Sequence, residues 1–145
     1  MKIEQEIKHE FVSAQQRALT NLIFTSNWAV NRISTALKPT SLSLQQFNAL
    51  SILYGQPQQM ATVNLIKDRL IDRMPNTSRL LNKLLEKGLI QKERNLNDQR
   101  VVYVKLTPTG AKLKEQARQI IDALPINLDE MQADYLNDLL EQVRK

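Results

Sequence analysis

The chain has no cysteine and only one histidine, His9. Disulfides, thiol redox chemistry and thiolate metal sites are therefore excluded, and a single imidazole cannot build a metal cluster. The 3 glycines do not form a glycine-rich loop of the kind that cradles phosphates. The carboxylates are scattered along the chain, so no converging set of titratable groups indicates an enzyme. We expect a protein without catalytic residues, metal ions or cofactors.

Long apolar runs are also missing. None approaches the ~20 residues that a membrane span requires. Residues 1–6 are too acidic and too poor in apolar side chains for a signal peptide. We therefore expect a soluble, cytoplasmic protein. Its 145 residues suit one domain, or one domain with an extension used in assembly.

Positive charge is concentrated in the middle of the chain. Residues 61–106 contain ten Lys/Arg and five Asp/Glu. The charge of this segment therefore equals the net charge of +5 of the whole chain. Residues 1–60 contain five basic and three acidic side chains, and residues 107–145 contain five and seven. A localised basic region points to a polyanionic partner, whereas a uniformly basic surface would indicate only solubility.

Helical periodicity surrounds a short extended region. Apolar spacing and end signals predict helices over 12–37, 43–54, 62–70, 75–87, 107–124 and 127–143. Two short extended runs, 89–93 and the β-branched and aromatic 101–106, flank a turn at 95–98 and indicate a hairpin. Residues 1–11 are expected to form a short helix or a loose arm. The fold class is therefore mainly α with a small β-hairpin.

The last predicted helix has more apolar surface than a monomer of this size can easily cover. A capping box of Asn127 and Glu130 is expected to begin it. Its apolar face contains Leu128, Met131, Tyr135, Leu136, Leu139 and Val143. Because this helix and the N-terminal helix lie outside the basic centre, we expect residues 1–40 and 107–145 to form a helical dimerisation region. Residues 41–106 would form a separate lobe.

One stretch, Arg73 to Lys87, combines helix signals with an unusual polar face. Pro75 suits the first turn of a helix, and Gly88 suits the αL position that ends one. At about 100° per residue, one side of this helix is apolar and the other carries amide and guanidinium groups. The polar side holds Asn76, Arg79, Asn82, Lys83 and Glu86. Amide and guanidinium groups are those that pair with adenine and guanine edges in a DNA major groove.

Taken alone, this pattern fits an ordinary amphipathic helix with a solvated polar face. The neighbouring segments favour DNA. The short helix over 62–70 precedes it closely, which gives the outline of a helix-turn-helix. The hairpin that follows carries Arg94 and Arg100 beside its tip. A basic finger beside a recognition helix can reach the adjacent minor groove.

Residues 80–110 carry a specific combination of motifs. These are Leu84 with Gly88-Leu89-Ile90, Asp98-x-Arg100 in the hairpin, and Leu106-Thr107 with Gly110. In these motifs and in its order of elements, nearly the whole chain resembles the multiple antibiotic resistance regulator (MarR) family of bacterial winged-helix repressors. The resemblance implies a homodimer in which the first and last two helices interleave. Each winged helix-turn-helix lobe would place residues 75–87 in a major groove and residues 94–100 in a minor groove of a pseudo-palindromic operator.

The resemblance also implies which side chains contact DNA. On the helix, the contact positions of the family correspond to Pro75, Asn76, Thr77, Ser78, Arg79, Asn82 and Lys83, although the helical pattern turns Thr77 inward. In the wing, Arg100 matches the arginine that enters the minor groove, and Asp98 matches the acid that orients it. Gln99 stands where many members have a second arginine. The structural alternatives are that Asp98 caps the turn and that Arg100 is a solvated cation.

These positions are expected to play different roles. We favour Asn76 and Arg79 for base readout and Arg100 for groove shape. Phosphate neutralisation, which makes affinity fall with salt, is expected from Lys67, Arg73, Lys83, Lys87 and Arg94.

A small-molecule effector is a further implication of the resemblance. Phenolic or other aromatic anions commonly bind between the dimer helices and the DNA lobe of such regulators. Trp28, Arg32 and Phe47 are the candidates here, and packing or surface roles are the alternatives for each. The absence of cysteine removes peroxide sensing. A rival reading of the whole chain is a winged-helix protein-interaction module without DNA binding, which predicts acidic or apolar residues on the exposed face of the recognition helix.

Overall fold

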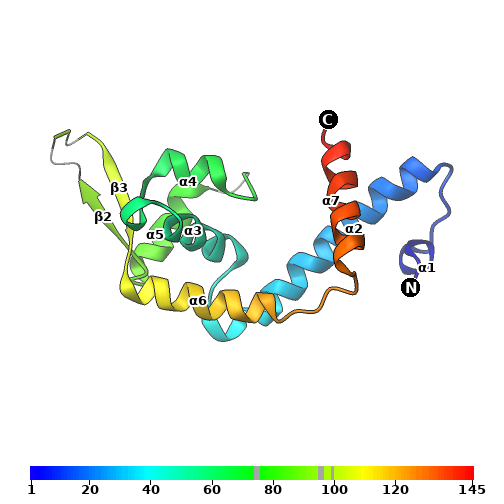
Figure 1. Cartoon of the computed structure of the whole chain (residues 1–145), viewed down its shortest axis with the longest axis horizontal. Helices are drawn as coiled ribbons and strands as arrows, with labels where there is room; N and C mark the ends of the chain where they lie inside the picture. The colour runs from blue at the N-terminus through cyan, green and yellow to red at the C-terminus, as the bar shows by residue number, and fades with distance from the viewer. Residues whose placement is uncertain (74–75, 95–96, 99) are drawn as a thin grey trace.

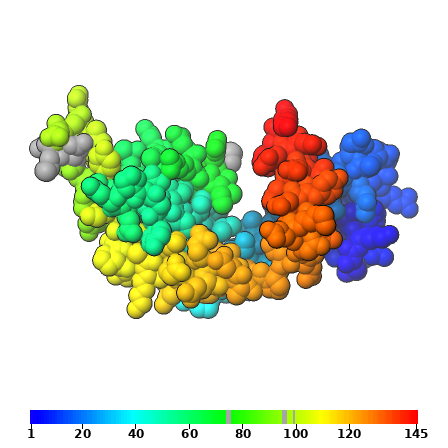
Figure 2. All heavy atoms as spheres, in the orientation of Figure 1, coloured from blue at the N-terminus to red at the C-terminus, as the bar shows by residue number. Residues whose placement is uncertain are grey.

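Two long helices connect a compact lobe to an outlying helical end (Figure 1). The computed structural model describes residues 1–145 except 74–75, 95–96 and 99. Helix α2 (Ala14–Ala36) enters the lobe, and α6 (Pro108–Asp122) leaves it. Helix α7 (Glu130–Val143) then stands beside α2, apart from the lobe (Figure 2). The proposed division into a dimerisation region and a DNA-binding lobe stays a prediction, because it concerns what each part binds.

Three short helices form the centre of the lobe. They are α3 (Leu44–Tyr54), α4 (Val63–Arg69) and α5 (Thr77–Glu86), with a short 3-10 turn η1 (Lys38–Thr40) between α2 and α3. Leu50, Leu53, Ile66 and Leu84 are fully buried and pack together in one core. The burial of these apolar side chains is the main force that holds the short helices in place, because isolated helices of this length are unstable in water.

A three-stranded antiparallel sheet covers one end of the lobe. Strands β2 (Ile90–Arg94) and β3 (Val102–Leu106) form the predicted hairpin, with Ile90 opposite Leu106. The third strand, β1 (Met60–Thr62), follows a short turn η2 (Pro57–Gln59) and pairs with β3, so the order is β1-β3-β2. The sequence pattern did not predict β1, because three residues are too few to show an alternating pattern.

Side-chain caps fix most of the helix boundaries. The Ser43–Gln46 capping box begins α3, and Thr107 caps α6 through a 3.0 Å hydrogen bond from the backbone N of Gly110. The predicted start of the last helix was wrong by about half a turn. Asp129, not Asn127, is its N-cap, since Asp129 Oδ1 accepts from the backbone N of Gln132 at 2.8 Å and Gln132 completes the box.

The N-terminal residues form a short helix, α1 (Ile3–Ile7), beside the beginning of α2. Ile3 is buried, and Glu4 forms an ion pair with Arg17 of α2. A backbone hydrogen bond, opposed by partial desolvation and aided by the charge of Arg17, lowers the pKa of the Glu4 carboxyl. The sequence left a short helix and a loose arm as alternatives for this segment, and the structure has the helix.

Candidate nucleic-acid interface

Helix α5 presents an exposed polar face from a firmly packed backbone. Leu80, Leu81 and Leu84 are buried in the core. The exposed side chains between them are Ser78, Arg79, Asn82, Lys83 and Glu86. The C-terminal end stops at Gly88, whose φ of +70° is the left-handed conformation that the sequence predicted. The face therefore has the amide and guanidinium groups that were expected on it.

The start of this helix contains three of the expected contact positions. Pro75 lies outside the described residues. Asn76 is the N-cap rather than a helical residue, because its Oδ1 accepts a hydrogen bond from the backbone N of Arg79 at 3.1 Å. Thr77 is only 8% exposed, so its side chain is withdrawn from the outward face. The helical pattern predicts that Thr77 points inward, and its burial confirms that orientation.

The turn between α4 and α5 is held by a contact that the sequence did not reveal. The backbone N of Ile71 donates to Asn48 Oδ1 on α3 at 2.8 Å. Lys67 on α4 and Arg73 after the turn are exposed, as phosphate contacts require. Asn48 is 23 residues away in sequence and had no local signal, so only the tertiary fold shows its role.

The β2–β3 hairpin, or wing, carries exposed cations on both sides of its turn. Arg94 ends β2 and is exposed. Beyond the turn, Asp98 Oδ1 accepts from the backbone N of Arg100 at 3.0 Å and from Arg100 Nε at 3.1 Å. The Arg100 side chain is nevertheless 92% exposed. Asp98 therefore caps the turn and also contacts the guanidinium, so both readings of this residue hold at once. Gln99 lies outside the described residues.

One expected phosphate contact is engaged elsewhere. Lys87 Nζ donates to the backbone O of Ser41 at 2.6 Å and to Gln46 Oε1 at 3.1 Å. Both Lys83 and Lys87 are exposed, but Lys87 differs from Lys83 because its ammonium already donates to these two uncharged oxygens of its own lobe. These tertiary partners of Lys87 cannot be read from the sequence. In the sequence, Lys87 is therefore as plausible a phosphate contact as the other cations near the helix.

The three candidate ligand residues do not form one site. Phe47 is 8% exposed and belongs to the core, with the Arg118 guanidinium 5.5 Å from its ring centroid. The Arg32 guanidinium lies 5.2 Å from the centroid of Trp28, and Arg32 Nη1 donates to the backbone O of Pro125 at 2.7 Å. Arg32 thus fastens α2 to the linker between α6 and α7. A ligand role for these residues stays a prediction.

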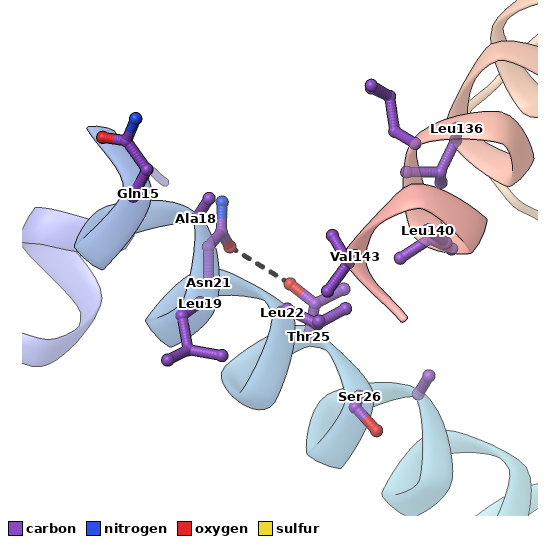
Figure 3. Close-up of a pocket in the computed structure, with 12 residues that line it drawn as sticks. Gln15, Ala18, Leu19, Asn21, Leu22, Thr25, Ser26, Leu136, Leu140 and Val143 are labelled. Atoms are coloured by element: carbon purple, nitrogen blue, oxygen red, sulfur yellow. Dashed lines mark hydrogen bonds between the residues drawn. The ribbon is translucent and has the colours of Figure 1, made fainter. Parts of the chain in front are cut away.

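A large apolar groove lies instead between α2 and α7 (Figure 3). Its volume is about 730 Å³. Apolar side chains of both helices dominate its walls, including Ala18, Leu22, Leu136, Leu140 and Val143. The surrounding surface is also apolar, since Met131 is 78% exposed and Tyr135 is 66% exposed. This confirms the excess apolar surface that was predicted for the last helix.

The described part of the chain adds two further findings. Among residues 1–73, 76–94, 97–98 and 100–145, no group of three or more His, Asp or Glu side chains is arranged to hold a metal ion. None of the helices in these ranges is long and apolar enough to cross a membrane.

The fold and the exposed face of α5 define a class. A helix-turn-helix of α4 and α5, followed by the β2–β3 wing, is the architecture of winged-helix transcription regulators. Residues 31–117 match the family model described as "Transcriptional regulator SarA/Rot". The multiple antibiotic resistance protein MarR of Salmonella typhimurium is 35% identical over 102 residues, which cover 70% of this chain and 69% of the relative. The chain belongs to the MarR family of winged-helix transcriptional regulators.

Solved structures agree with this assignment. A cysteine-to-serine mutant of Escherichia coli MarR, complexed with operator DNA, is 28% identical with a TM-score of 0.75, and the match covers 92% of this chain and 99% of that one. The organohalide-sensing regulator RdhR-CbdbA1625 in its 2,4-dichlorophenol-bound form has a TM-score of 0.78 at 18% identity, covering 92% and 80% of the two chains. At that identity the second likeness shows the fold alone.

Proposed function

We propose that this protein is a homodimeric repressor that binds a pseudo-palindromic operator and is released from it by a small aromatic or anionic ligand. The outward face of α5 carries the proposal. Arg79, Asn82 and Lys83 are exposed there, and their donors suit base edges and phosphates. The relative in complex with operator DNA supports the same partner.

The exposed apolar surface supports the dimer. Leu19 on α2 is 58% exposed, and Leu139 and Val143 on α7 are 40% and 65% exposed. A soluble monomer rarely exposes an apolar patch of this extent, and a second copy of the same two helices offers a matching surface. Two lobes joined in this way would bind half-sites about one turn apart, ~34–36 Å, which is the spacing of successive major grooves on one side of DNA.

A ligand effect requires a difference in affinity between two states of the dimer. A small molecule releases DNA only if it binds better to an arrangement of the lobes that mismatches the operator. The exposed Trp28, with the Arg32 guanidinium 5.2 Å from its ring centroid, supports an aromatic or anionic effector. The family resemblance supports repression rather than activation.

Selection of DNA from a random duplex library tests the proposal. The purified chain should enrich a sequence with two inverted half-sites, and its affinity should fall steeply as salt rises. Sedimentation analysis should give a dimer at the concentrations used for binding. Benzoic acids and phenols, 2,4-dichlorophenol included, should then be titrated into the complex. A reporter that carries the selected site within its promoter distinguishes repression from activation.

The protein-interaction module remains the rival. It predicts acidic or apolar residues on the exposed face of α5, and among the described residues of that face the only acid is Glu86. If the library selection enriches no sequence, and the affinity for every duplex equals that for bulk DNA, the repressor proposal is wrong and the rival stands.

A further inference from the structure

The C-terminal end of the recognition helix is bonded to two other parts of the lobe, the connection that leads from α2 into α3 and the start of α6. Lys87 is the C-cap of α5, and Gly88 follows. On one side Lys87 reaches Ser41, which directly follows α2 and η1. On the other side the carbonyl of Gly88 accepts a hydrogen bond from Thr107 Oγ1 at 2.8 Å, and Thr107 is the N-cap of α6. Two adjacent residues therefore join α5 to the connection between η1 and α3 and to the N-cap of α6.

The contacts of Lys87 are well defined. Its ammonium donates to Ser41 O at 2.6 Å and to Gln46 Oε1 at 3.1 Å. Gln46 is 7% exposed and also accepts from the backbone N of Ser43 at 3.1 Å. The α3 capping box therefore fixes the position of Gln46 Oε1 independently of Lys87. Hydrogen bonds from a charged donor to a fixed acceptor are stronger than average and have little freedom of direction.

The Thr107 side of the junction is equally tight. The backbone N of Thr107 donates to Leu89 O at 3.1 Å, in addition to the bond from its hydroxyl to Gly88. A Cβ on Gly110 would lie 2.0 Å from the same Leu89 oxygen, so the first turn of α6 contacts this strand entry directly. The side that Lys87 holds has no such backbone contact among the described residues. There the hydrogen bonds of the Lys87 side chain add to the core packing of Leu81 and Leu84.

We propose that Lys87 is a positioning residue for DNA binding. It fixes the angle of the recognition helix against the α2–α3 junction, and it does not act by neutralising a phosphate. This inference rests on the proposed DNA-binding function. Helix α5 is about 15 Å long, so a tilt of about 10° at Lys87 moves its N-terminal turn by about 2.5 Å. That shift is larger than the tolerance of a base-edge hydrogen bond.

The test compares two lysines of the same helix. Lys87→Met removes the ammonium and keeps the aliphatic stem, and Lys83→Met does the same on the exposed face. Affinities are measured for the library-selected duplex and for poly(dI-dC) between about 50 and 200 mM salt. Lys83→Met should lower the salt slope by about 1 for both DNAs. Lys87→Met should weaken binding to the selected duplex roughly tenfold, with its slope and its affinity for poly(dI-dC) unchanged.

Two further measurements separate positioning from simple stability. Hydrogen exchange of the α5 amides in the absence of DNA should be faster in Lys87→Met, and the folded fraction at the binding temperature should stay complete. Lys87→Arg, which keeps a charged donor at this position, should restore most of the affinity for the selected duplex.

The competing outcomes are distinct. If Lys87→Met lowers the slope by about 1 and weakens both DNAs alike, Lys87 is a phosphate contact and the inference is wrong. If folded Lys87→Met binds the selected duplex as tightly as the parent does, the contacts of Lys87 with Ser41 and Gln46 are not needed for recognition, and the inference is wrong. If the parent chain itself selects no duplex, the proposed function fails, and this inference fails with it.

Discussion

The guanidinium of Arg100 is contacted by the carboxylate of Asp98, only two residues earlier, while its side chain remains 92% exposed. An exposed pair of this kind contributes ~0–1 kcal/mol to folding, so stability does not explain the arrangement. Its physical effect is to restrict the directions that a long, flexible cation can take. A restricted, exposed guanidinium loses less conformational entropy when it enters a groove.

Arg100→Ala should therefore weaken operator binding about tenfold and reduce the salt slope by about 1, with little change in sequence preference. Asp98→Ala should weaken binding roughly threefold with the slope unchanged, because the acid contacts no phosphate and acts by capping the turn and orienting the arginine. Anisotropy titrations over a range of salt concentrations measure the affinity and the salt slope of both variants. Tighter binding by Asp98→Ala would show that the acid merely repels DNA.

Arg79 is the exposed guanidinium in the first turns of α5, and it tests base readout. Arg79→Ala should cost about 1–3 kcal/mol of affinity for the selected duplex and far less for poly(dI-dC). Arg79→Lys should restore the affinity for poly(dI-dC) but not that for the selected duplex, because a lysine cannot reproduce a bidentate contact. Glu86→Gln, on the same face, is the matched control and should change either affinity no more than about twofold. Equal losses on both DNAs after Arg79→Ala would make Arg79 a phosphate contact.

Local signals explain which parts of the fold could be read from the sequence. The apolar spacing of α2, α3, α5 and α6, the Ser43–Gln46 box and the positive φ of Gly88 depend on residues within a few positions of one another. The same holds for the Asp98–Arg100 motif of the wing. Strand β1 was missed because its pairing partner, β3, lies about 40 residues away.

The candidate site contains contacts that local signals could not show. A helical wheel placed Asn76 on the recognition face, but its Oδ1 forms the cap of the helix. Lys87 was counted among the phosphate contacts, but Ser41 and Gln46, more than 40 residues earlier, hold its ammonium. Phe47 was a ligand candidate, but it is a core residue. In each case a contact that is distant in sequence, or specific to a helix end, decides what an otherwise suitable side chain does.

The three glycines should respond differently to alanine. Gly110→Ala places a Cβ 2.0 Å from Leu89 O and 2.9 Å from a Leu106 methyl, so α6 must shift at a cost of about 3 kcal/mol. Gly88→Ala meets no atom within 4 Å but keeps a φ of +70°, which costs about 1–2 kcal/mol. Gly55→Ala is the control, with ordinary contacts and a φ of −81°, and should lie within about 0.5 kcal/mol of the parent. Urea unfolding at one fixed protein concentration measures the free energy of unfolding of each variant and so gives the order of the three losses. An equal loss for Gly110→Ala and Gly55→Ala would contradict the close packing at Leu89.

The groove between α2 and α7 provides the test of assembly. Leu139 lines it, whereas Asn137, on the same helix, is exposed and is not among the lining residues. Leu139→Glu should disrupt the dimer, because an unpaired carboxylate would be buried in an apolar interface. Asn137→Glu introduces the same charge and should leave the dimer intact. Sedimentation velocity measures the assembly, and circular dichroism checks that both variants remain folded.

The consequence for DNA separates assembly from recognition. A monomer retains one intact lobe, so Leu139→Glu should bind a duplex with a single half-site as the parent's individual lobe does. On the full palindrome it should lose roughly a hundredfold in affinity, because the second lobe no longer binds at the high effective concentration that a shared dimer gives it. If the monomeric variant keeps the parent's affinity for the palindrome, the two half-sites are not bound by one dimer. If Leu139→Glu remains dimeric, another surface holds the two copies together.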